Sequence, residues 1–376
     1  MKVLLGTGLG FLGVGGLGSY TRTLSAGLAH LQVENRLVYP PPYSVFDRYI
    51  AGIQACGNLD RARVALTRLR TKRVARMARE LLRADGDFTL IHTQDVLLAR
   101  SMADCGLPLV TTVHGPLSRE ARMLGRGSRD YLRYLETAER EAYHAARAII
   151  AVDTGQKEIV VNDFQVPPEK VHVVLNAVNT DIFAPTRPTA PIRERYLLVP
   201  RRLVRKNGVH VAIRALGALS NATVNLWIAG DGPERKALEA LVTDLRLQGR
   251  VRFLGDVPRE AMINLLNSAS GVIIPSVPAD GVIEASSIAA LEGMAMGKPV
   301  YASNIGGLAE MIRHGDTGWL FPAGKDAMLA DLLRQHLDDR KSSQMMGGRA
   351  RAYVIAHHSL PVWLNAIMGV YQHACS

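Results

Sequence analysis

Residues 196–228 read YLLVPRRLVRKNGVHVAIRALGALSNATVNLWI. Two apolar runs, Tyr196–Val199 and Val224–Ile228, flank a stretch with helical periodicity, Gly208–Leu219. A buried strand, a crossover helix and a second buried strand make a βαβ unit, whose two strands lie parallel in one sheet. This stretch therefore predicts an α/β fold with a parallel sheet.

The same alternation extends in both directions along the chain. It predicts strands at residues 2–5, 36–39, 89–93, 109–113, 148–152 and 171–174, and again at 196–199, 224–228, 251–253, 271–274, 299–302 and 318–320. A Pro- and Thr-rich segment, residues 176–191, separates the two series. We expect two doubly wound domains, with a ligand cleft at the carboxyl ends of their strands where the domains face one another.

The composition is that of a globular protein, with 48% apolar and 21% charged residues, and it excludes a collagen-like, coiled-coil or disordered chain. Cys56, Cys105 and Cys375 form no motif, so neither a disulfide framework nor a zinc ribbon is predicted. Charged residues, Gly or Pro interrupt every apolar stretch before about 18 residues, so no membrane span is predicted. The expected location is the cytoplasm.

The net charge is +11, which favours phosphorylated small molecules, anionic lipid headgroups or polyanions as partners. Nine basic residues and one acid lie between Arg61 and Arg83, with apolar residues at helical spacing. This basic helix is either a solvated outer face or a docking face for the inner surface of a membrane or a charged acceptor. A nucleic-acid role is disfavoured because the segment lacks interleaved aromatic residues.

Glycines dominate the first 18 residues, MKVLLGTGLGFLGVGGLG, which hold two overlapping G-x-G-x-x-G matches, Gly8–Gly13 and Gly13–Gly18. Their density favours a first strand and a phosphate-binding loop over a signal peptide. A nicotinamide enzyme also needs an acid at the end of the second strand, and Leu37-Val-Tyr39-Pro offers none. A nicotinamide-dependent oxidoreductase is therefore the weaker alternative function.

Two cations follow the strand that opens the second domain. Arg202 and Lys206 lie four residues apart, just before the predicted helix at Gly208. A guanidinium and an ammonium beside a helix N-terminus suit a diphosphate, although a basic surface turn would give the same pattern.

Two glutamates, Glu284 and Glu292, flank the start of another predicted helix. The small residues Ala285-Ser-Ser287 open that helix, so the backbone N–H groups of Ser286, Ser287 and Ile288 would face whatever Glu284 binds. A carboxylate beside helix-start amides suits sugar hydroxyls next to a phosphate.

In the first domain, His92 and His114 are each expected at a strand end, where a parallel sheet places its active site. Asp85-Gly-Asp87 resembles the D-x-D that binds a divalent metal in some sugar transferases, but it is more simply interpreted as a turn.

Together these segments resemble the family-4 glycosyltransferases, a retaining group with the GT-B fold. Arg202, Lys206 and Gly208 resemble its R-x-x-x-K-G element, with Asn207 between the lysine and the glycine, and Glu284 and Glu292 match its E-x7-E element. The Gly13–Gly18 loop, the Thr112-Val-His114-Gly segment, Asn176-Ala-Val-Asn179, Gly230-Asp-Gly-Pro233 and Leu291–Pro299 are similar to further family segments. The family usually has E-G-F-G where this chain has Glu284-Ala-Ser-Ser, which leaves the sugar and the shape of this loop open.

The resemblance implies roles in the second domain. Arg202 and Lys206 would hold the donor diphosphate, and Glu292 would bind the ribose hydroxyls. Glu284, with the amides of residues 286–288, would grip the transferred sugar, and the backbone at Gly255 and Asp256 would read the base. In the first domain, the amides of Gly15 and Gly16 would approach the diphosphate, and His114 would contact the sugar.

The resemblance also implies the overall organisation and the reaction. Residues 1–184 would form an acceptor-binding domain, with helix 360–376 packed back on it, and residues 185–359 a donor-binding domain. The expected enzyme is a metal-independent, retaining hexosyltransferase with no cofactor. A UDP-sugar is favoured over GDP-mannose as donor. The acceptor stays open between a lipid-linked and a small molecule.

Overall fold

The computed structural model describes residues 1–9, 16–41, 59–125, 128–186, 194–219 and 224–376. The chain divides into two compact units, Met1–Leu175 with Leu364–Ser376, and Asn176–Trp363. The sequence placed these divisions at residues 184 and 360. Residues 176–183 are instead built into the second unit, in which the side chains of Val178 and Phe183 are buried.

The first unit is built on a six-stranded parallel sheet with the order β2-β1-β3-β4-β5-β6. Its strands are β1 (Lys2–Gly6), β2 (Glu34–Val38), β3 (Leu90–Thr93), β4 (Leu109–Val113), β5 (Ala148–Ala151) and β6 (Val171–Val173). Every residue of β1 is buried, and β1 pairs with β2 on one side and with β3 on the other. The apolar start of the chain is therefore an interior strand of the sheet, as the glycine-rich loop after it indicated.

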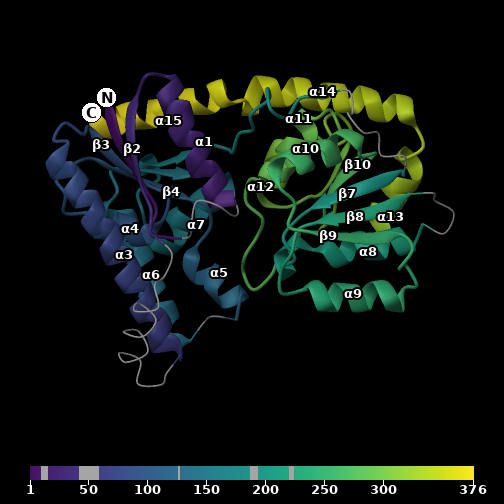
Figure 1. Cartoon of the computed structure of the whole chain (residues 1–376), viewed down its shortest axis with the longest axis horizontal. Helices are drawn as coiled ribbons and strands as arrows, with labels where there is room; N and C mark the ends of the chain where they lie inside the picture. Colours follow the sequence, from purple (N-terminus) through teal and green to yellow (C-terminus); the bar gives the residue numbers. More distant parts are fainter. Residues whose placement is uncertain (10–15, 42–58, 126–127, 187–193, 220–223) are drawn as a thin grey trace. The chain divides into compact units, whose positions relative to one another are not determined.

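Helices cover both faces of this sheet (Figure 1). α3 (Leu59–Ala84), α4 (Val96–Met102), α6 (Arg129–Ala145) and α7 (Thr154–Phe164) share one apolar core with the strands. The short α5 (Leu117–Met123) packs against α6. α1 (Gly16–His30) and α15 (Leu360–Cys375) meet where a Cβ on Gly27 would lie 2.7 Å from the Leu364 side chain. The last helix of the chain thus completes the first unit.

The second unit repeats this plan with the strand order β12-β11-β10-β7-β8-β9. Its strands are β7 (Tyr196–Pro200), β8 (Asn225–Ala229), β9 (Val251–Gly255), β10 (Gly271–Ile274), β11 (Val300–Ser303) and β12 (Trp319–Phe321). Its helices are α8 (Val209–Gly217), α9 (Arg235–Asp244), α10 (Arg259–Ser268), α11 (Ile288–Ala295), α12 (Gly306–Met311), α13 (Asp326–His336) and α14 (Arg340–His358). The order reverses between β7 and β10, which is the topological switch point of a doubly wound sheet.

The basic helix of the first unit, α3, is amphipathic as predicted. Val74, Ala75 and Ala78 are buried in the core, whereas most of its basic side chains are exposed, Arg76 among them. Burial of the apolar stripe leaves a cationic outer surface, and contact of that surface with a membrane stays a prediction. No helix in the described ranges is long and apolar enough to cross a bilayer.

Candidate functional site

The loops that follow β7 and β10 meet at the switch point of the second unit. The backbone N–H of Val277 donates to the carbonyl of Lys206 at 2.8 Å. Gly208 has φ +60°, and a Cβ there would lie 1.9 Å from the carbonyl oxygen of Pro275. Only glycine allows this close approach of the two backbones. The loop that carries Arg202 and Lys206 is therefore held against the segment that leads to Glu284.

A buried ion pair, Arg201 with Glu284, lies at the centre of this site. The guanidinium Nη2 of Arg201 donates to Glu284 Oε2 at 2.7 Å, and the two side chains are 9% and 10% exposed. Arg201 also donates to the hydroxyls of Ser276 and Ser287, each at 3.2 Å, and to the side-chain oxygen of Asn207. One guanidinium thus connects residues that follow β7, residues that follow β10 and the start of α11.

The sequence analysis selected Arg202, but the structure buries its neighbour Arg201. Arg202 is exposed and Lys206 is partly exposed, so both can reach a ligand in solution. The side-chain amide of Asn207 donates to the carbonyl oxygen of Arg202 at 2.7 Å, which holds the loop in shape. The doubled arginine at 201–202 was the available sequence signal, and spacing alone did not show which of the two points inward.

The predicted serine loop lies at the start of α11. Ser287 is the N-cap of this helix, and its hydroxyl accepts from the N–H of Ala290. Asn176 donates from its backbone N–H to the Ser286 hydroxyl at 3.0 Å and from its side-chain amide to the Ser286 carbonyl at 2.6 Å. Both hydroxyls therefore bind protein groups. The Asn176 segment, expected in a linker, supports the loop instead.

Glu292 lies on α11, eight residues after Glu284, and is half-buried. Burial raises the pKa of its carboxyl group from 4.5 to about 7, although the positive charge of Arg259 opposes the rise. A carboxylate kept partly protonated at neutral pH is unusual away from functional sites. Ribose hydroxyl donors would stabilise its ionised form.

Gly255 is the last residue of β9 and Asp256 follows it, farther from the switch point than Arg201. Gly255 accepts the N–H of Gly230 through its carbonyl at 2.7 Å, which joins the predicted Gly230-Asp-Gly-Pro233 loop to the end of β9. Asp256 is exposed. Both residues thus lie at the carboxyl edge of the sheet where a nucleotide base was expected, and their contact with a base stays a prediction.

In the first unit, Asp95 organises the carboxyl ends of β1 and β3. It caps α4 by accepting from the N–H groups of Leu97 and Leu98, and it also accepts from the Thr7 hydroxyl and the Gly8 N–H. The start of the glycine-rich loop is therefore fixed to the sheet. Of the two glycines predicted there, Gly16 opens α1 and is exposed, and Gly15 lies outside the described residues.

His114, at the end of β4, is the first member of a polar chain that runs into the core. Its Nε2 lies 3.1 Å from Gln94 Oε1, and Gln94 Nε2 lies 3.2 Å from His92 Nε2. His92 Nδ1 then lies 2.7 Å from the hydroxyl of Tyr371 on α15. Because a carbonyl oxygen only accepts, the hydrogen of His114 lies on Nε2, and Nδ1 keeps the lone pair.

Burial lowers the pKa of His114 to about 4 and that of His92 to about 3. Both imidazoles are therefore neutral at physiological pH. This series of polar contacts links the two predicted histidines. It gives His92 a structural position behind His114. Sequence spacing could not show this link, because Tyr371 lies 279 residues beyond His92.

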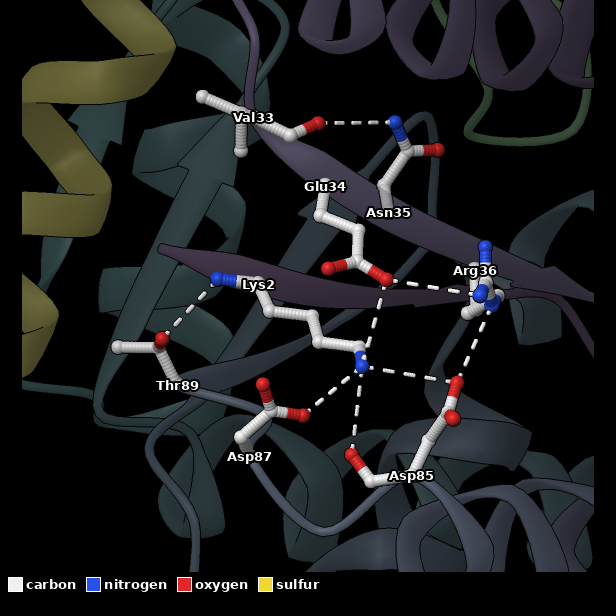
Figure 2. A network of polar contacts seen from close by, with 8 residues as sticks. All are labelled: Lys2, Val33, Glu34, Asn35, Arg36, Asp85, Asp87 and Thr89. Atoms are coloured by element: carbon white, nitrogen blue, oxygen red, sulfur yellow. Dashed lines mark hydrogen bonds and ion pairs between the residues drawn. The ribbon is translucent and has the colours of Figure 1, made fainter.

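The carboxylates of the Asp85-Gly-Asp87 segment form ion pairs with a lysine, Lys2. Lys2 Nζ lies 2.8 Å from Asp87 Oδ1, 3.5 Å from Asp85 Oδ2 and 3.3 Å from Glu34 Oε1, and Figure 2 draws these contacts. The simpler interpretation as a turn agrees with the hydrogen bond from the Asp87 N–H to the Asp85 carbonyl. These carboxylates anchor the first strand of the sheet.

The family comparisons cover nearly the whole chain. Residues 14–182 match the family described as Glycosyltransferase Family 4, and residues 185–353 match the family described as Glycosyl transferases group 1. The chain belongs to glycosyltransferase family 4. It is a hexosyltransferase that transfers a sugar from a nucleotide-sugar donor, and this membership favours the transferase over the oxidoreductase alternative.

Relatives of this glycosyltransferase come from several organisms. An uncharacterised glycosyltransferase of Methanocaldococcus jannaschii is 32% identical over 60% of this chain and 59% of its own length. The alpha-D-kanosaminyltransferase of Streptomyces kanamyceticus is 29% identical over 71% of each chain. The crystal structure of Anabaena HepE with UDP-glucose has a TM-score of 0.74 at 20% identity and covers 98% of both chains. This structural likeness agrees with the GT-B fold predicted from the sequence.

Proposed function

We propose that this glycosyltransferase transfers a hexosyl unit from a UDP-sugar to an acceptor hydroxyl with retention of the anomeric configuration. The observation that carries the proposal is the second unit's switch point, where the Arg202–Lys206 loop and the Glu284 loop are hydrogen-bonded into one site. UDP is favoured because the similar fold of HepE has been determined with UDP-glucose.

The chemical step breaks the bond between the sugar C1 and the oxygen of the β-phosphate, and the bonding electron pair stays on the diphosphate. A new bond forms between C1 and the acceptor oxygen on the same face of the sugar. The acceptor proton passes to the departing phosphate oxygen. Arg202 and Lys206 offset the charge that develops on the diphosphate, and such preorganised electrostatics is usually the largest catalytic effect.

These cations allow the reaction to proceed without a metal in our proposal. Glu284 holds hydroxyls of the transferred sugar rather than forming a covalent intermediate, because we expect it beside those hydroxyls and not at the reacting carbon. Glu292 binds the ribose through its ionised form. The roles of His114, Gly16 and the Gly255–Asp256 backbone, together with a shared cleft, are retained as predictions.

The first test is the thermal stability of the protein without added metal and with UDP, GDP, ADP, NAD or no ligand. A ligand at about 100 times its Kd stabilises the folded protein by about 2.7 kcal/mol, so the binding nucleotide raises Tm measurably. We expect a rise with UDP that is lost in Lys206→Ala. A rise with NAD alone would refute the proposal, and a rise with GDP alone would refute its choice of base.

Retention has a separate test. Slow hydrolysis of UDP-α-glucose, with water as the acceptor, should first release α-glucose, which proton NMR distinguishes from β-glucose before mutarotation. Initial release of β-glucose would show inversion and would refute the proposed same-face step.

A further inference from the structure

We infer that Arg201 is a positioning residue for sugar transfer, acting through Glu284 and not through contact with the donor. The inference rests on the proposed function, in which Glu284 holds the sugar. Neither the motif spacing nor the predicted roles of Arg202 and Lys206 require a buried arginine at this position.

The contacts of Arg201 determine which oxygen of Glu284 can serve the sugar. Oε2 accepts from Arg201 Nη2 at 2.7 Å, whereas Oε1 accepts no hydrogen bond from any residue that the structure describes. A charge-assisted hydrogen bond of this kind is strong and directional. Arg201 therefore fixes the carboxylate plane and leaves Oε1 as the acceptor for a sugar hydroxyl.

The remaining contacts of the guanidinium hold it in place. The Ser276 hydroxyl follows β10, the Ser287 hydroxyl caps α11, and the side-chain oxygen of Asn207 lies on the diphosphate loop. Contacts with three separate segments thus hold the planar guanidinium of Arg201 in one orientation. A lysine at this position would keep the charge but could not reproduce the fork of donors.

Ser287, which departs from the family pattern, takes part in the contacts of Arg201. Where the family usually has glycine, Ser287 accepts a hydrogen bond from Arg201 while it caps α11. The buried arginine and the Glu284-Ala-Ser-Ser sequence thus belong to one network. The same network predicts that Arg201 affects the chemical step more than nucleotide binding, because UDP carries no transferred sugar.

The test compares Arg201→Gln, Arg201→Lys, Glu284→Gln and the double variant Arg201→Gln/Glu284→Gln. The control is Arg334→Gln, since Arg334 lies on α13 of the same unit, outside the proposed donor site, and its ion pair with Asp331 is exposed. Each protein is assayed for UDP release from UDP-glucose, giving kcat and KM, and for UDP binding by calorimetry. If the nucleotide panel selects GDP, the same assays use GDP-mannose and GDP. Thermal denaturation confirms that each variant folds.

We expect kcat to fall about 10- to 100-fold in Arg201→Gln, the range known for residues that orient metal ligands through hydrogen bonds, with the Kd for UDP changed less than about threefold. Arg201→Lys should recover part of the loss, and Arg334→Gln should match the unmodified protein. The double variant should be no slower than Glu284→Gln, because both changes disable the same carboxylate.

Two results would overturn the inference. Unchanged kcat in Arg201→Gln, with slow Glu284→Gln, would show that Glu284 needs no positioning by Arg201 while leaving the proposed function intact. Equal losses of kcat and UDP affinity, with no recovery in Arg201→Lys, would show a merely structural role. Unchanged kcat in Glu284→Gln would instead refute the proposed role of Glu284 itself.

Discussion

Glu292 makes the stability of the second unit depend on pH in a way that a single substitution can remove. Burial raises the pKa of its carboxyl group from 4.5 to about 7. A pKa difference of one unit corresponds to about 1.4 kcal/mol, so this rise corresponds to a free-energy difference of about 3 kcal/mol between the folded and unfolded chains. Between these two values the folded chain binds the proton more tightly than the unfolded chain does. The free energy of unfolding therefore falls as the pH rises from about 4.5 through about 7.

Glu292→Gln replaces the titrating group with a neutral side chain of similar size. Relative to the unmodified protein, the variant should gain up to about 3 kcal/mol in unfolding free energy between pH 4.5 and pH 8. Urea unfolding at half-unit steps of pH measures this difference, with Glu260→Gln as a control that removes an exposed carboxylate. Parallel pH profiles for Glu292→Gln and the unmodified protein would refute the burial argument.

The same group links nucleotide binding to pH. Ribose hydroxyls donate hydrogen bonds, so they favour the ionised form of Glu292, and binding of UDP at pH 7 should release part of a proton. Calorimetry in buffers of different ionisation enthalpy detects this release. The affinity for UDP should rise from pH 6 to pH 8 in the unmodified protein and stay nearly constant in Glu292→Gln. A proton release that survives this substitution would exclude Glu292 as the ribose ligand.

Three further changes test the structure. Gly208→Ala places a side chain at a residue with φ +60°, against the Pro275 carbonyl. Chemical denaturation should show that the free energy of unfolding falls by about 1–3 kcal/mol or more. Tyr371→Phe removes the hydroxyl that His92 binds, and it should cost about 1–3 kcal/mol by the same measurement. Lys2→Met leaves three carboxylates without their shared cation and should lower Tm, with high salt reducing the difference between the two proteins. An unchanged stability in any of these variants would contradict the corresponding contact.

Much of the fold could be predicted from local patterns. The twelve expected strands are all present, and Leu109–Val113 and Gly271–Ile274 have the predicted bounds. Strands buried on both faces are continuous apolar runs, so they stand out from amphipathic helices without any knowledge of their partners. Glu284 and Glu292 could also be selected, since helix-start signals lie between them.

The pairing of distant side chains could not be predicted in the same way. Arg201 and Arg202 are adjacent and chemically identical, yet one is buried against Glu284 and the other is exposed. The direction of each side chain depends on how β7 packs beside β10, which is a property of the sheet and not of the spacing. Asn176 likewise sits in a segment with loop composition but supports Ser286.

The sequence by itself determined the order of strands and helices, the two-unit α/β architecture and the residue types available for a diphosphate and a sugar. These follow from hydrophobic periodicity and turn chemistry, which act over a few residues. Only the tertiary structure decided that Arg201 holds Glu284 and that Tyr371 stands behind His92 and His114. Such contacts join residues 83 to 279 positions apart. They form because an unpaired polar group in a packed core costs free energy, so most buried polar groups are hydrogen-bonded there.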